Sequence, residues 1–137
     1  MFTPEPAAQL WLETFVRAQG GAAGTIHRRE GNQLILVAAV NIPPPVIAAT
    51  LTIPSGKGMA GLALERKEPV QTCNLQTDRT GDVRPGALAV QAQAAIALPA
   101  FDPTGEVRAV VGLAFANERE LSAEEIARLT EAVVTAP

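Results

Sequence analysis

Apolar residues near the N-terminus recur at three- and four-residue spacing. Ala8, Trp11, Leu12, Phe15 and Val16 fall on one stripe when the segment is drawn as a helix. Polar residues separate them and would face water. The pattern therefore predicts an amphipathic helix whose stripe packs against the rest of the protein, with the only tryptophan of the chain in the core.

The ends of this first helix have recognisable signals. Thr3 is a suitable N-cap, and Pro4 follows it at the first helical position, where a missing N–H costs nothing. Gly20 and Gly21 are expected to end the helix, since glycine adopts the left-handed cap conformation at little cost.

A hairpin is predicted next, with arms over residues 22–30 and 33–40. Gly31 and Asn32 lie between them, a pair that tolerates positive φ in a two-residue turn. The first arm is partly polar, so we expect its histidine, His27, to be solvated or at a sheet edge. The second arm is apolar on both faces, which is typical of a strand covered from both sides.

Three successive prolines within residues 41–45 predict a stiff, extended connection. Gly56, Gly58 and Gly61 then spell G-x-G-x-x-G, which also occurs in dinucleotide-binding proteins. Those proteins need a long helix that crosses over a parallel sheet, whereas Pro69 stops the helix here after about two turns. We therefore interpret the glycines as a turn that leads into a short packed helix.

Three further strands are predicted after this helix. One covers residues 70–73 and is followed by a long polar segment, and the other two cover 94–100 and 107–116. A turn with proline and glycine in favoured positions joins the last two. Because hairpins dominate, the sheet is expected to be antiparallel.

The last element is a helix that begins with a capping box, Ser122 and Glu125. Both terminal helices are amphipathic, so they must bury their stripes against one face of the sheet. The short central helix and the loops are left to cover the other face. This arrangement predicts an α+β fold, and the length suits a single domain over residues 1–137.

Composition narrows the functions. With 47% apolar and 18% charged residues, the chain has globular rather than disordered composition. A net charge of −3 without a basic segment argues against nucleic acid. No uncharged apolar run approaches the roughly twenty residues that span a bilayer, so we expect no membrane partner. A lone cysteine, Cys73, makes no internal disulfide, and the cytoplasm is the expected compartment. No metal-ligand cluster is evident.

In the order and spacing of these features the chain resembles a GAF domain, a small-molecule sensor module of signalling proteins. The resemblance rests on the G-x-G-x-x-G stretch, the segment 62–70 after it, Asp78, and the later pair of strands. It implies a profilin-like central antiparallel sheet of five to six strands with a ligand pocket under loops on one face. A PAS-like fold is the alternative, disfavoured because its helices lie within the sheet connections.

Some members of that family are catalytic or bind a cofactor, and each of these functions needs particular residues. Free methionine-R-sulfoxide reductases need a nucleophilic cysteine shortly after Pro85-Gly86, where this chain has residues 87–90 without one. Bilin attachment needs a cysteine and a histidine in the same region, and haem needs an axial histidine, which His27 on a hairpin arm does not suit. The signature of the cyclic-nucleotide-binding members is not recognised in this sequence. The sequence therefore predicts no enzyme and no cofactor.

We expect a cytoplasmic signal-transduction module that binds an unidentified small molecule between the sheet and residues 74–90. One alternative is a ligand-free dimerisation or docking module, in which the terminal helices pair as a homodimer. Another is an enzyme that uses Cys73. The candidate ligand-binding residues combine polar groups with an apolar lining: Met59, Leu62, Thr72, Asn74, Asp78, Arg79, Asp82, Arg84 and Ile96.

Overall fold

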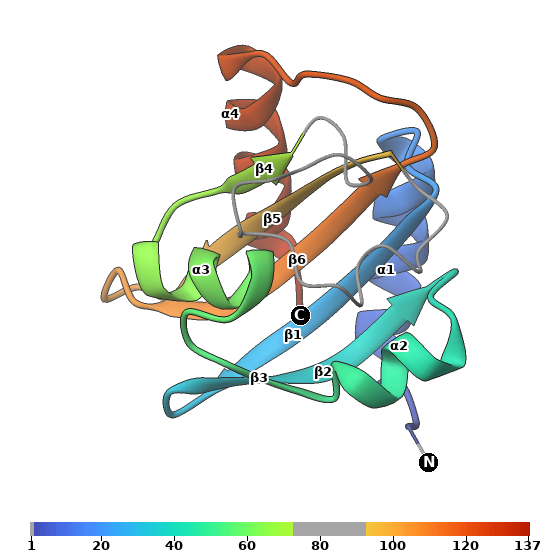
Figure 1. The fold of residues 1–137 in the computed structure, drawn as a ribbon. Helices are drawn as coiled ribbons and strands as arrows, with labels where there is room; N and C mark the ends of the chain where they lie inside the picture. The colour runs from blue at the N-terminus through green and yellow to red at the C-terminus, as the bar shows by residue number, and fades with distance from the viewer. Residues whose placement is uncertain (1, 73–92) are drawn as a thin grey trace.

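One antiparallel sheet dominates the computed structural model, which describes residues 2–72 and 93–137 (Figure 1). Its strands are β1 (Ala23–Glu30), β2 (Gln33–Val40), β3 (Thr52–Pro54), β4 (Val70–Thr72), β5 (Ala94–Phe101) and β6 (Val107–Phe115). They are ordered β3-β2-β1-β6-β5-β4, and every pair is antiparallel. The predicted α+β fold with five to six strands is confirmed.

The hairpin of β1 and β2 has the predicted two-residue turn. Glu30 opposes Gln33, so Gly31 and Asn32 alone connect the strands. Gly31 has a φ of 64°, whereas Asn32 is not among the residues with positive φ. This suits a turn with glycine in its first central position, whose twist matches that of the strands.

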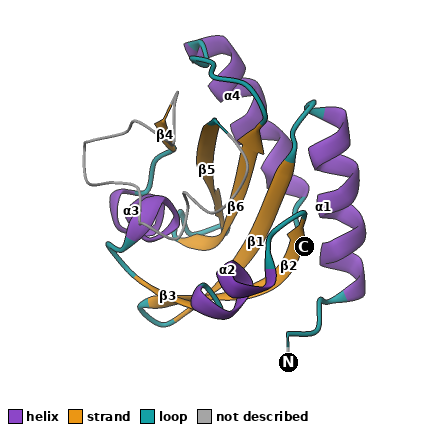
Figure 2. Cartoon of the chain, turned by 45° about the vertical axis from the view of Figure 1, so that its right-hand side comes forward, coloured by secondary structure: helices purple, strands orange, loops and turns teal. Residues whose placement is uncertain are grey.

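The two terminal helices, α1 (Pro6–Ala18) and α4 (Ala123–Ala132), lie on the same face of the sheet (Figure 2). Their buried side chains join those of the central strands in the larger apolar cluster. Trp11 is half-buried: its ring stacks on Phe15 at 4.8 Å between centroids, and its Nε1 donates to Thr135 Oγ1 at 3.0 Å. The tryptophan thus connects α1 to the turn that follows α4.

One helix start differs from the prediction and the other agrees with it. The N-cap of α1 is Glu5, with Pro6 at the first helical position, not Thr3 with Pro4. The backbone N–H of Glu5 donates to Val37 O in β2 at 2.9 Å. This hydrogen bond holds Glu5 in an extended conformation, so the helix begins only at Pro6. The capping box of Ser122 and Glu125 at the start of α4 is present as predicted.

The opposite face is covered in part by the short helices α2 (Pro44–Ala49) and α3 (Gly58–Arg66). Leu64 of α3 is buried in the second apolar cluster, with Val70 of β4 and Val110 of β6. The proline run does not form only an extended connection, because Pro44 and Pro45 begin α2. Proline is tolerated there, since the first N–H groups of a helix have no partner within it.

None of the helices in the described ranges is long and apolar enough to cross a membrane.

Candidate functional site on the sheet face opposite the terminal helices

Small side chains occupy two adjacent rows on the sheet face that α3 partly covers. Directly opposed residues of antiparallel strands share a face, so the register identifies the rows. Ala97 packs in the cluster with α3, which fixes the face. The two rows, called here the small-residue floor, comprise Ala39, Thr25, Gly112 and Ala97 in one and Ala23, Ala114, Ala95 and Thr72 in the other; in β4 the first row ends in Val70, which packs with α3.

The two faces of the same strands differ in the size of their side chains. On the face under α1 and α4, Ile26, Leu98 and Leu113 are almost fully buried and fill the core. On the other face, no member of the floor is larger than threonine, and Ala95 and Ala114 are only half-buried. The side chains of the floor are therefore short, whereas those of the opposite face are long.

A buried histidine lies in the next row of the same face. His27 of β1 opposes Val110 and Leu36 and is 2% exposed. Its Nε2 lies 2.8 Å from the carbonyl oxygen of Thr50, the C-cap of α2. Since a carbonyl only accepts, Nε2 carries the proton and Nδ1 is an acceptor. Among the described residues, Nδ1 has no hydrogen-bond partner.

Burial lowers the pKa of His27 to about 4, against the opposing effect of the hydrogen bond to Thr50. The imidazole is therefore neutral at pH 7, and its Nδ1 is a buried acceptor. The expectation of a solvated or edge histidine was wrong. The polar neighbours of His27 in sequence suggested exposure, but β1 is a central strand and α2 lies across this position.

Met59, Leu62 and Thr72 lie on the predicted side of the sheet. Met59 and Leu62 are half-buried on α3 and pack against its cluster, while Thr72 closes one row of the floor. Ile96 does not join them. It opposes Gln71 and Leu113, is 1% exposed, and belongs to the cluster under the terminal helices. Because side chains alternate along a strand, Ala95 and Ala97 face the candidate site instead.

The remaining predicted ligand-binding residues stay predictions. They lie outside the described residues, as does Cys73: Asn74, Asp78, Arg79, Asp82 and Arg84.

The G-x-G-x-x-G stretch has a packing role. Gly56 has a φ of 85°, and its N–H donates to Gly61 O at 2.8 Å. A Cβ on Gly61 would lie 2.6 Å from the carbonyl oxygen of Pro54, so only glycine fits there. The glycines thus let the start of α3 lie directly against the end of β3, in agreement with the turn inferred from the sequence.

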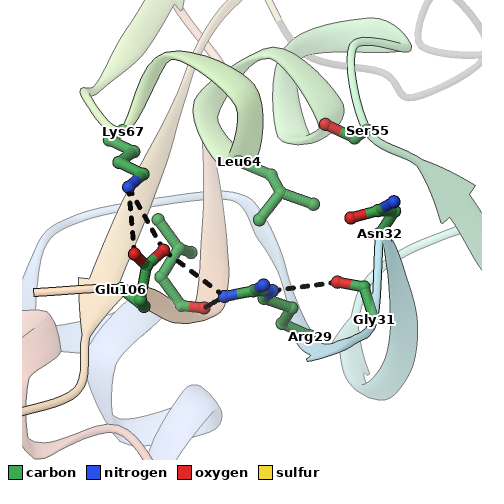
Figure 3. A pocket seen from close by; sticks show the side chains of 8 residues that line it. Arg29, Gly31, Asn32, Ser55, Leu64, Lys67 and Glu106 are labelled. Atoms are coloured by element: carbon green, nitrogen blue, oxygen red, sulfur yellow. Dashed lines mark hydrogen bonds and ion pairs between the residues drawn. The ribbon is translucent and has the colours of Figure 1, made fainter. Parts of the chain in front are cut away.

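A separate hollow of about 110 Å³ lies between the β1–β2 turn, the C-terminal end of α3 and the β5–β6 turn (Figure 3). Arg29, Lys67 and Glu106 supply its charges. This group was not predicted from the sequence, because its members come from three elements far apart in the chain. The floor was not predicted either, although small residues at every second position, such as Gly112 and Ala114, were a usable signal.

Within residues 2–72 and 93–137, no group of three or more histidine, cysteine, aspartate or glutamate side chains could hold a metal ion.

The family model of the GAF domain matches residues 3–136, which is nearly the whole chain. Among curated proteins, no match was found.

Several solved structures have the same fold. The GAF domain of a phosphoenolpyruvate-protein phosphotransferase from Coxiella burnetii has a TM-score of 0.73 at 19% identity, over 94% of this chain and 80% of that one. A type II free methionine-R-sulfoxide reductase from Thermoplasma acidophilum has a TM-score of 0.70 at 20% identity, over 95% of this chain and 90% of that one. The free methionine-R-sulfoxide reductase from Neisseria meningitidis, solved in complex with its substrate, has a TM-score of 0.67 at 15% identity, over 89% of this chain and 72% of that one.

These neighbours contradict the prediction that the chain is not an enzyme. That prediction relied on one missing cysteine after Pro85-Gly86 and on the lack of familiar catalytic groups. The fold itself carries a reductase activity in neighbours that match most of this chain. At 15–20% identity they show the fold alone, yet they make catalysis a question for experiment.

Proposed function

Since the chain belongs to the GAF domain family, we propose that it is a sensor that binds a small molecule over the small-residue floor. The observation that carries the proposal is the contrast between the two faces of the sheet. Large side chains fill one face, whereas two rows of the other carry only alanine, glycine and threonine across β1, β6 and β5, beside a buried histidine. Binding there would transmit a signal by shifting a conformational population.

The floor suggests the chemistry of the ligand. Its alanine side chains suit an apolar or flat portion of a molecule, whereas the Thr25 hydroxyl fills the space over Gly112. Nδ1 of His27 is a buried acceptor at neutral pH and cannot donate a hydrogen bond. A ligand that reaches this nitrogen must therefore bring an N–H or O–H donor beside an apolar body. The predicted polar residues Asn74, Asp78, Arg79, Asp82 and Arg84 are proposed as further contacts.

The test is a metabolite screen by thermal shift, with Ala95→Leu as the site variant and Ala127→Leu as its control. Ala95 is half-buried in the floor, while Ala127 is exposed on α4. A leucine in the floor fills space that the ligand needs. We expect a hit whose affinity falls at least about tenfold in the floor variant, equivalent to roughly 1.4 kcal/mol, and is unchanged in the control. Equal affinity in both folded variants would place the ligand elsewhere.

Methionine sulfoxides belong in that screen, because free methionine-R-sulfoxide reductases share the fold. Consumption of the compound in the presence of a thiol reductant should be measured together with binding. Thiol-dependent reduction requires a cysteine nucleophile, and Cys73 is the only cysteine of the chain. Cys73→Ser separates the two functions, since binding over the floor does not require the thiol and catalysis does.

The alternative function is a dimerisation or docking module that needs no ligand. Two side chains favour it: Leu10 of α1 and Val134 after α4 are each 66% exposed on the outer side of the terminal helices. Light scattering distinguishes this function, because a homodimer through the helices predicts a doubled mass that Leu10→Glu reduces.

A further inference from the structure

We propose that the hollow between the β1–β2 turn, α3 and the β5–β6 turn is a second binding site, which takes a single oxyanionic group such as phosphate. It is distinct from the small-residue floor and does not depend on the sensor function.

Two cations from different elements converge on this hollow (Figure 3). Arg29 comes from the end of β1: its Nε donates to Gly31 O at 2.9 Å, and its Nη1 donates to Val107 O at 3.3 Å. Lys67 follows α3 in the left-handed conformation, with a φ of 57°. The backbone contacts fix the plane of the guanidinium, which is the group best suited to an oxyanion.

One carboxylate lies between the two cations. Glu106 Oε2 is 3.1 Å from Lys67 Nζ and 3.7 Å from Arg29 Nη1. Two positive charges therefore meet one negative charge, and the lining keeps a net positive charge although the whole chain carries −3. An anion in the hollow would add to the neutralisation, to which Asp102 also contributes from outside the lining. The hydrogen bond from Thr104 and, to a smaller extent, the charge of Arg29 lower the pKa of that carboxyl.

Glu106 is a replaceable partner. The side chains of this triad are between 33% and 51% exposed, and ion pairs this accessible are weak. Glu106 also lies at the end of an exposed turn, so its side chain can turn outward at little cost. A dianion such as phosphate would compete with it for Arg29 and Lys67.

The remaining walls suit one small group rather than a whole metabolite. Asn32 and Ser55 add neutral polar side chains, and Leu64 forms an apolar wall. The volume of about 110 Å³ admits a few water molecules or one oxyanion. Pockets that enclose complete ligands are larger, about 300 Å³ or more. The hollow would therefore hold free phosphate or the phosphate end of a longer ester.

The test is an NMR titration of the ¹⁵N-labelled full chain with sodium phosphate at constant ionic strength, with glycerol phosphate and acetate as further arms. The amides of Gly31, Asn32 and Lys67 report on the hollow. We expect saturable shifts there with a dissociation constant of about 1 mM. Tighter binding of glycerol phosphate than of phosphate would identify an ester as the preferred source, and the reverse would identify the free ion.

Glu106→Gln removes the competing charge while keeping the shape of the side chain. We expect it to tighten phosphate binding about five- to tenfold. Its control is Glu131→Gln on the exposed side of α4, which changes the net charge equally and should leave binding unchanged. Arg29→Gln with Lys67→Gln should abolish the shifts.

Two results would overturn the proposal. One is a lack of saturable shifts in Glu106→Gln up to about 50 mM phosphate, well above the expected dissociation constant. The other is equal tightening by Glu131→Gln, which would show a general charge effect. Because Glu106→Gln keeps both cations, the outcome does not depend on whether the double variant folds.

Discussion

His27 lies in a central strand of the sheet, and its Nδ1 has no hydrogen-bond partner within residues 2–72 and 93–137. Its protonated Nε2 is held by Thr50 O, and burial keeps the ring neutral by lowering its pKa to about 4. Charging this ring would place a cation in an apolar environment between β1 and α2. The residue therefore links the stability of the protein to pH.

The pH dependence has a definite sign. The ordinary pKa of 6.5 applies to the unfolded chain, which takes up a proton below that pH, whereas the folded protein does so only near pH 4. The contribution of the neutral ring to the free energy of unfolding is complete above pH 6.5, and it is lost as the pH falls towards 4. The full loss is at most about 3 kcal/mol. Urea denaturation at a series of pH values measures it.

His27→Gln is the matched variant for this measurement. The amide can still donate to Thr50 O, but it does not titrate in this range. The fall in stability between pH 6.5 and 4 should be smaller in the variant. The fall that remains measures the effect of protonating the carboxylates. Identical pH profiles for the two proteins would show that His27 is not responsible.

At the scale of elements, α4 shows how a local sequence signal fixes the start of a helix. Ser122 Oγ accepts from Glu125 N at 3.1 Å, and Glu125 Oε1 accepts from Ser122 N at 3.2 Å. The hydrogen bond from the Ser122 backbone contributes most to a lowered pKa of Glu125, which also forms an ion pair with Arg119. All the groups that make this cap lie within seven consecutive residues, so the sequence predicted the box correctly.

Ser122→Ala should destabilise the protein by about 1 kcal/mol, because the N–H of Glu125 loses its acceptor. Ser122→Asn should retain most of the stability, since asparagine is an equally good N-cap. Thermal or urea denaturation of the three proteins provides the test. Equal losses in both variants would point to a role of the hydroxyl other than capping.

At the scale of the whole molecule, Arg108 holds the C-terminus against the sheet. It lies at the bulge between β5 and β6, where Ala100 opposes Ala109 and Phe101 opposes Val107. Its guanidinium donates to Val134 O and Ala136 O, each at 2.8 Å. These carbonyls belong to the end of the 3-10 turn after α4, so one side chain connects the last helix to the far end of the sheet.

Arg108→Met should loosen α4 by removing these charge-assisted hydrogen bonds while keeping the aliphatic part of the side chain. We expect a loss of about 1–2 kcal/mol, given the partial exposure of the arginine. Amide hydrogen exchange in α4 should become faster in the variant, by more than it does in β1. Arg128→Met, on the exposed side of α4, is the control and should change little. A uniform increase across the sheet would contradict a local tether.

The fold was largely predictable, and the candidate site only in part. Met59, Leu62 and Thr72 were assigned to the side of the sheet on which they lie, because they belong to the short helix and strand that follow the glycine turn. Ile96 was assigned by its apolar character alone. Whether a residue of an all-apolar strand faces one side or the other depends on register, which a single sequence does not reveal.

The sequence alone determined three of the four α-helices, the hairpins and the antiparallel sheet, since periodicity, caps and turns act between residues close in the chain. The exception is α2, which forms where an extended connection was predicted. Only the tertiary structure decided which side chains meet. It buried His27 against α2, turned Ile96 towards the terminal helices, and brought Arg29, Lys67 and Glu106 around one hollow. Such contacts arise from the packing of distant elements, and the physical preferences of neighbouring residues do not contain them.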